Sequence, residues 1–193
     1  TAPFSMMKRK LWNDSLSIAL ASQALAEHTG INGYAAFATG MLSNIGQLAI
    51  TRCFLSTYNK MYKQELTDAF NAKDKRLHNI LTKIESSPEL LLEQLTLRSS
   101  QLSAELIELM NFDRLPITEA MFDLAYTETL DKMSPLAQIV TKAKVYVDYR
   151  SLAKAKLITE HETLALFQAA KLTKAEISLL KKSDIDHIKL KFN

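Results

Sequence analysis

Histidines, cysteines and carboxylates are the side chains that most often bind metals or transfer protons in proteins. The chain has four histidines, His28, His78, His161 and His187. None is followed by aspartate, and no two lie three or four residues apart, the spacing that lets one helix present two ligands to a metal. The sequence also has no glycine-rich phosphate loop and no nucleophile elbow. We therefore interpret the histidines as surface or helix-end residues, not as ligands.

The single cysteine, Cys53, excludes an internal disulfide framework. It lies in the apolar stretch 50–55 (ITRCFL), which favours a buried structural thiol over a catalytic nucleophile. The cysteine usage suits a reducing compartment, and no apolar run approaches the ~18 residues needed to span a bilayer. These observations predict a cytoplasmic protein without a membrane partner.

Composition predicts an all-α fold. Among 193 residues, 47% are hydrophobic, which is enough to build a core, and only 4 are glycine and 4 are proline. Folds made of strands need many turns, and turns are rich in these two residues. The net charge is +3 and the basic residues are spread along the chain, so we expect solvated helix faces and no nucleic-acid partner.

The elements that must position any site begin with two apolar helices, predicted over residues 6–28 and 33–54. Small residues line one face of the first helix: Ala19, Ser22 and Ala26. In the second helix, Gly40 and Gly46 each lower helix stability by about 1 kcal/mol relative to alanine. Close approach to the backbone of a neighbouring helix is the simplest compensation, so we predict tight packing at both glycines.

Further helices are predicted from their start signals. A third helix is expected over 57–70 and a shorter one over 75–84. Cap-plus-proline signals predict helix starts at 87–88 and 134–135, and another helix is expected to begin at 115–116. A break is expected near 98–100 in the helix that starts at 87–88. Capping boxes at 159–162 and 173–176 predict two more helices, and residues 184–193 a loose tail.

Several of these segments together resemble the HDOD family, the HD-related output domains of bacterial signalling proteins. Residues 11–15 (LWNDS) are similar to its Trp-x-x-Ser helix, and residues 36–48 (AFATGMLSNIGQL) resemble its Ala-Phe-x-x-Gly-Leu-Leu-His-Asp-Ile-Gly-Lys-Leu segment. Residues 115–116 (LP) and 136–143 (LAQIVTKA) are similar to its later helices. The resemblance covers roughly residues 10–150 and implies an HD-domain-like helical bundle.

The resemblance also implies a division of the chain. Residues 1–150 would form the HDOD-like domain, and residues 151–193 a C-terminal helical extension. The family's usual N-terminal helices would precede Trp12 and are missing, so we expect a fragment or a shortened member. Their loss would leave an apolar face open to a protein partner, a second copy of the chain or an associated N-terminal fragment.

The HD phosphohydrolases related to this family bind one or two metals through histidines and aspartates, which leave positions open for water and phosphate. Where the His-Asp pair should stand, this chain has Ser43 and Asn44. Where an upstream helix often carries histidine it has Asp14, and where a later helix often supplies aspartate it has Lys144. The resemblance therefore implies a vestigial site with no catalytic residues, no metal and no cofactor.

Three hypotheses follow. The first is a pseudoenzyme, a regulatory module for signal transduction that acts through contacts with a protein partner or in a homo-oligomer. The second is a diverged metal-dependent phosphohydrolase that uses Asp14 with Asp123 or Asp131. The third is a sensor in which Lys144 and Asn44 bind an anionic nucleotide in the vestigial pocket.

Overall fold

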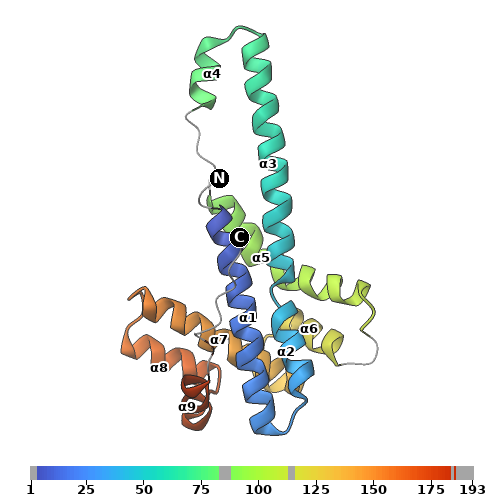
Figure 1. The fold of residues 1–193 in the computed structure, drawn as a ribbon, viewed down its shortest axis with the longest axis vertical. Helices are drawn as coiled ribbons and strands as arrows, with labels where there is room; N and C mark the ends of the chain where they lie inside the picture. Colours follow the sequence, from blue (N-terminus) through green and yellow to red (C-terminus); the bar gives the residue numbers. More distant parts are fainter. Residues whose placement is uncertain (1–3, 83–87, 113–115, 184, 186–193) are drawn as a thin grey trace.

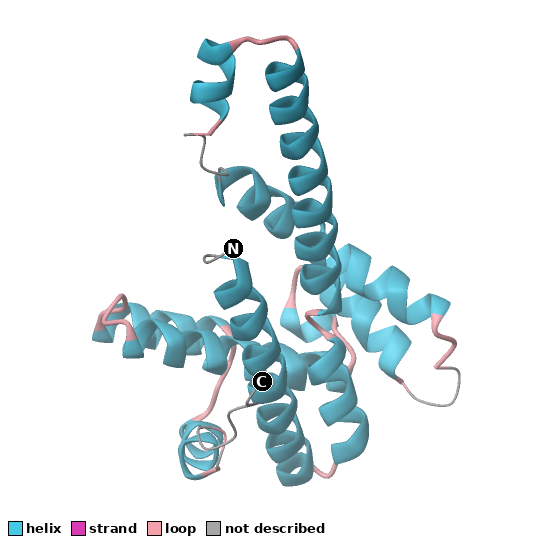
Figure 2. Ribbon diagram, turned by 45° about the horizontal axis from the view of Figure 1, so that its top comes forward, coloured by secondary structure: helices cyan, strands magenta, loops and turns pink. Residues whose placement is uncertain are grey.

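The computed structural model describes residues 4–82, 88–112, 116–183 and 185, and this part of the chain is helical and contains no strand (Figures 1 and 2). The elements are α1 (Phe4–Thr29), α2 (Gly33–Leu42), α3 (Ile45–Asn71), α4 (Lys75–Leu81), α5 (Pro88–Leu109), α6 (Ile117–Tyr126), the 3-10 turn η1 (Leu130–Lys132), α7 (Pro135–Lys154), α8 (Glu160–Ala169) and α9 (Lys174–Lys182). The predicted all-α fold is confirmed.

The main core lies where α1, α2 and α7 pack together. Its buried apolar residues include Ile18, Leu25, Ala36, Val140 and Val147. Two smaller clusters lie beside it, one between α5 and α6 and one between α3 and the start of α5. Figure 1 shows α1 and α2 side by side, and the hairpin of α3 and α4 extending away from this core.

The predicted helix over 33–54 is wrong in its bounds. The helix ends at Leu42, and a new helix begins at Ile45 and continues through 55–56, where we expected a gap, to Asn71. Asn44 takes φ −106° and ψ 10°, which interrupts the helical backbone before α3. The two-residue break therefore falls on the Ser43–Asn44 pair, at the positions where the resemblance places the metal ligands.

The helix predicted to break near 98–100 is also continuous, since α5 runs unbroken from Pro88 to Leu109. Ser99 and Ser103 lie one turn apart on the face that meets α3, and the Ser103 hydroxyl donates to the Ser99 carbonyl over 2.9 Å. Ser99 and Ser103 therefore allow α5 to pack closely on α3, and they do not end the helix.

The two predicted capping boxes are confirmed at the starts of α8 and α9, in which Thr159 and Thr173 are the N-cap residues. Pro135 is the first residue of α7, as predicted. The predicted end of the short helix at residue 84 and nearly all of the predicted tail at 184–193 lie outside the described residues.

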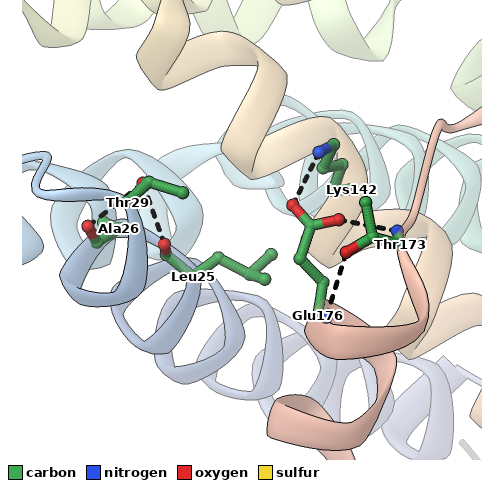
Figure 3. Close-up of polar contacts among 6 residues, drawn as sticks. All are labelled: Leu25, Ala26, Thr29, Lys142, Thr173 and Glu176. Carbon is green, nitrogen blue, oxygen red and sulfur yellow. Dashed lines mark hydrogen bonds and ion pairs between the residues drawn. The ribbon is translucent and has the colours of Figure 1, made fainter.

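Helix α9 packs against the body of the protein through a buried ion pair. Glu176 is 7% exposed, and its Oε1 accepts a hydrogen bond from the Lys142 ammonium of α7 over 2.6 Å. The second carboxylate oxygen accepts from the backbone N–H of Thr173 over 2.7 Å (Figure 3). Leu180 and Ile185 join the same core as α1. The predicted division between residues 150 and 151 falls inside α7 and stays a prediction.

Candidate functional site

Ser43 and Asn44 are buried, at 5% and 4% exposure, in the break between α2 and α3. The Ser43 hydroxyl donates to the carbonyl of Gly40 over 2.8 Å and helps to end α2. Asn44 is the N-cap residue of α3, although its side chain makes no capping hydrogen bond. The hydroxyl of Ser43 therefore has a structural role at the position where the resemblance places a histidine.

The hydroxyl of Ser103 on α5 holds this break in place. It accepts a hydrogen bond from the backbone N–H of Gly46 over 2.9 Å. It also lies 3.2 Å from the carbonyl of Ser43, to which it can donate. Sequence reasoning missed Ser103, because it is 57 residues from Gly46 and no local pattern links the two.

Gly46 allows this contact because α3 and α5 almost touch here. A Cβ atom built on Gly46 would lie 2.1 Å from the carbonyl oxygen of Ser99 and 2.8 Å from the backbone nitrogen of Ser103. A Cβ on Gly40 would lie 2.8 Å from Cα of Ala19, at the crossing of α1 and α2. The predicted close approach at both glycines is confirmed.

Asp14 and Lys144 belong to a cluster of four charged residues between α1 and α7. Asp14 forms an ion pair with Lys10, one turn earlier on α1. Burial of the Lys144 ammonium lowers its pKa, and the charge of Asp148 opposes that shift. Burial raises the pKa of Asp148; Lys144 and Lys10 lower it, whereas Asp14 raises it. The structure thus brings Asp14 and Lys144 to one cluster, in which opposite charges compensate.

The residues at the four vestigial positions do not fit a divalent metal: they are Asp14, Ser43, Asn44 and Lys144. The four positions carry one carboxylate, one ammonium, one hydroxyl and one amide, whereas a metal of the HD type needs several imidazole and carboxylate ligands. Within the described ranges, no group of three or more histidine, cysteine, aspartate or glutamate side chains is arranged to hold a metal ion.

The other carboxylates considered as ligands have partners elsewhere. Asp123 accepts a hydrogen bond from the backbone N–H of Ser134 over 2.6 Å, next to the start of α7. Burial raises its pKa, but hydrogen bonds with Ser134 and Thr127 outweigh that effect and leave the pKa below the usual value. Asp131 forms an ion pair with Lys171 over 2.5 Å. Each carboxylate thus joins two segments of the fold.

A groove with a volume of about 880 Å³ lies between α3 and α5. Its walls carry exposed apolar side chains, among them Met61 of α3 and Leu90 and Leu97 of α5, which are 62%, 53% and 61% exposed. Cys53 also lines the groove and is exposed, so the prediction of a buried thiol is wrong. Cys53 therefore lies on the part of α3 that borders the open groove.

No helix in the described part of the chain is long and apolar enough to cross a membrane. Comparison with curated proteins and with solved structures found no match. A family model described as the HDOD domain matches residues 3–86, which contain α1 to α4 and the break at Ser43 and Asn44. The Trp-x-x-Ser motif of residues 11–15, the crossing of α1 and α2 at small residues and the break that needs Gly46 all lie inside this match, so the similarity to the HDOD domain is carried by residues 3–86.

Proposed function

We propose that this chain is a non-catalytic HDOD regulatory module that acts in signal transduction by binding a helical segment of another protein. The exposed apolar groove between α3 and α5 carries the proposal. The HDOD match supports a signalling role. The contacts of Ser43 and the charges around Lys144 support a fold that is retained for binding and not for catalysis.

The groove suits an amphipathic helix. On α3 the lining includes residues spaced three or four apart (Ile50, Phe54, Thr57 and Met61), and on α5 it includes a similar series (Leu90, Gln94, Leu97 and Gln101). Two helices with such faces form a channel that accepts the apolar stripe of a third. The stretch from Leu90 to Glu105 spans about 22 Å, or about four turns of a bound helix. Arg98 and Glu105 provide one charge of each sign for partner residues of opposite charge.

Cys53 offers a direct test of this surface. With a photo-crosslinker attached to Cys53 of the full chain in its source cell, we expect cross-links to an amphipathic helical segment of another protein, identified by mass spectrometry. Leu97→Glu should reduce the yield at least about tenfold, because a buried carboxylate in the interface is strongly unfavourable. Leu164→Glu, at an equally exposed leucine on α8, should leave the yield unchanged.

Two results would contradict the docking proposal. Cross-links that persist in Leu97→Glu would show that the partner does not occupy the groove. Cross-links to a second copy of the chain, together with a dimer by light scattering, would assign the groove to self-association instead.

The absence of catalysis is tested separately. Protein purified without chelator or affinity-tag metal should contain well below one transition-metal ion per chain by elemental analysis. It should also not hydrolyse a generic phosphodiester with added Mn²⁺ or Mg²⁺. Hydrolysis that disappears in Asp14→Ala, but persists in the exposed control Asp68→Ala, would favour the phosphohydrolase alternative.

A further inference from the structure

A second concavity lies between the N-terminal half of α1 and the C-terminal end of α7, away from the α3–α5 groove. It consists of two adjoining hollows of about 480 Å³ and 150 Å³, which share Asp14, Ser151 and Lys154 in their walls. The larger hollow falls in the size range of small-molecule sites, roughly 300–1,000 Å³. We call the two hollows together the α1–α7 cleft.

Positive charge faces the cleft from both walls. Arg9 and Lys10 of α1 line one side, and Arg150 and Lys154 of α7 line the other. Asp14 is the single carboxylate in the described lining, so the lining carries a formal excess of three positive charges. Asp148 and Lys144 are not among the lining residues, and their opposite charges interact with each other. The excess equals the net charge of the whole chain, +3, so the lining is far more basic than the average surface.

The partial negative charge at the end of a helix explains only part of this pattern. Lys154 lies in the last turn of α7, where cations are ordinarily stabilising. The effect does not extend to Arg9 and Lys10, which lie on another helix beyond its first turn. Like charges on opposite walls of a cleft repel each other, and an anion bound between them removes that repulsion.

The cleft also supplies hydrogen-bond donors. The hydroxyls of Ser17 and Ser151 come from opposite walls. Asn13 contributes a side-chain amide to the lining, and the NH₂ group of that amide is a hydrogen-bond donor. Arginine and lysine around hydroxyl and amide groups form a donor set suited to phosphate oxygens.

We propose that the α1–α7 cleft binds the phosphate group of a small-molecule ligand, with Arg9 and Lys154 holding the phosphate from the two walls. The phosphate belongs either to a mononucleotide, whose size suits the larger hollow, or to free inorganic phosphate. This site is independent of the α3–α5 groove, so failure of either proposal leaves the other standing.

Isothermal titration calorimetry of the full chain at low ionic strength tests the proposal with three probes: AMP, inorganic phosphate and adenosine. We expect AMP or phosphate to bind and adenosine not to bind. Tighter binding of AMP would identify a nucleotide site, and equal binding of phosphate would identify a free-anion site. Binding should weaken as salt is added, because the contacts are between exposed charges.

Substitutions locate the site. The double variant Arg9→Gln/Lys154→Gln should weaken binding at least about tenfold, because it removes one cation from each wall. The control Lys60→Gln/Lys63→Gln removes the same charge from exposed positions on α3 and should bind as the parent does. Both pairs are on the surface, so circular dichroism should show an unchanged fold. The proposal is overturned if no probe binds at millimolar concentration, if adenosine binds as well as AMP, or if the cleft variant retains full affinity.

Discussion

Gly46→Ala is expected to destabilise the protein by at least about 3 kcal/mol, enough to remove a large part of the stability of an ordinary domain. The added methyl group would lie 2.1 Å from the carbonyl oxygen of Ser99, and that atom belongs to the backbone of a continuous helix. Helices α3 and α5 would have to separate, which would also break the hydrogen bond from Gly46 to Ser103. Urea unfolding followed by circular dichroism measures the loss.

Two other glycines provide matched controls for this prediction. A methyl group on Gly33 would meet Cγ and Oε1 of the Glu27 side chain at 3.1 Å, and this flexible chain can move away, so we expect little change. A methyl group on Gly40 would meet Cα of Ala19 at 2.8 Å, so an intermediate loss is expected. If Gly46→Ala proves as stable as Gly33→Ala, the close approach of α3 and α5 described here is incorrect.

Glu176→Ala is the second large effect, and it should release α9 from the body of the protein at a cost of about 3 kcal/mol. The change leaves the Lys142 ammonium, which is 18% exposed, without its carboxylate. It also removes the acceptor for the backbone N–H of Thr173 at the start of α9. Hydrogen exchange of α9 amides should increase together with the drop in the free energy of unfolding.

Glu162→Ala is the matched control, because Glu162 occupies the same capping-box position in α8 and hydrogen-bonds Thr159, but its side chain is exposed. Its effect should be much smaller and confined to the start of α8. Equal losses in the two variants would mean that the pair with Lys142 contributes nothing beyond capping.

The Glu176 ion pair also predicts a pH dependence. Burial raises the pKa of Glu176, but the hydrogen bonds from Lys142 and Thr173 outweigh that effect and leave the pKa below its ordinary value of 4.5. The ionised carboxylate therefore stabilises the folded state above that ordinary value, and this contribution is lost as the pH falls through the lowered pKa. Urea midpoints measured between about pH 7 and about pH 3 should fall more steeply for the parent than for Glu176→Gln.

Local sequence signals predicted the parts of this fold that depend on neighbours along the chain. The scarcity of glycine and proline indicated helices, and the capping boxes at Thr159 and Thr173 fixed the starts of α8 and α9. The cost of glycine inside a helix led to the prediction of close packing at Gly40 and Gly46, which the contacts of Ala19 and Ser99 confirm.

The features that escaped prediction depend on contacts between distant parts of the chain. The break at Ser43 and Asn44 lies beside the hydroxyl of Ser103, far along the sequence. The exposure of Cys53 depends on which face of α3 meets α5, and an apolar local sequence does not reveal that. The α1–α7 cleft likewise joins residues 9–17 to residues 147–155, and no motif links these two stretches.

The position of α9 has a consequence for how this protein folds during synthesis. Leu180 and Ile185 belong to the same core as Ile18 and Leu25 of α1. The first helix of the chain therefore packs against residues that lie near the end of the described part. A contact across more than 150 residues cannot form until α9 has emerged from the ribosome. Until then the apolar face of α1 lacks part of its cover, and the nascent chain is exposed to aggregation or to chaperone binding. The smaller cluster of α3 and α5 needs no residue beyond Leu95 and can form well before that point.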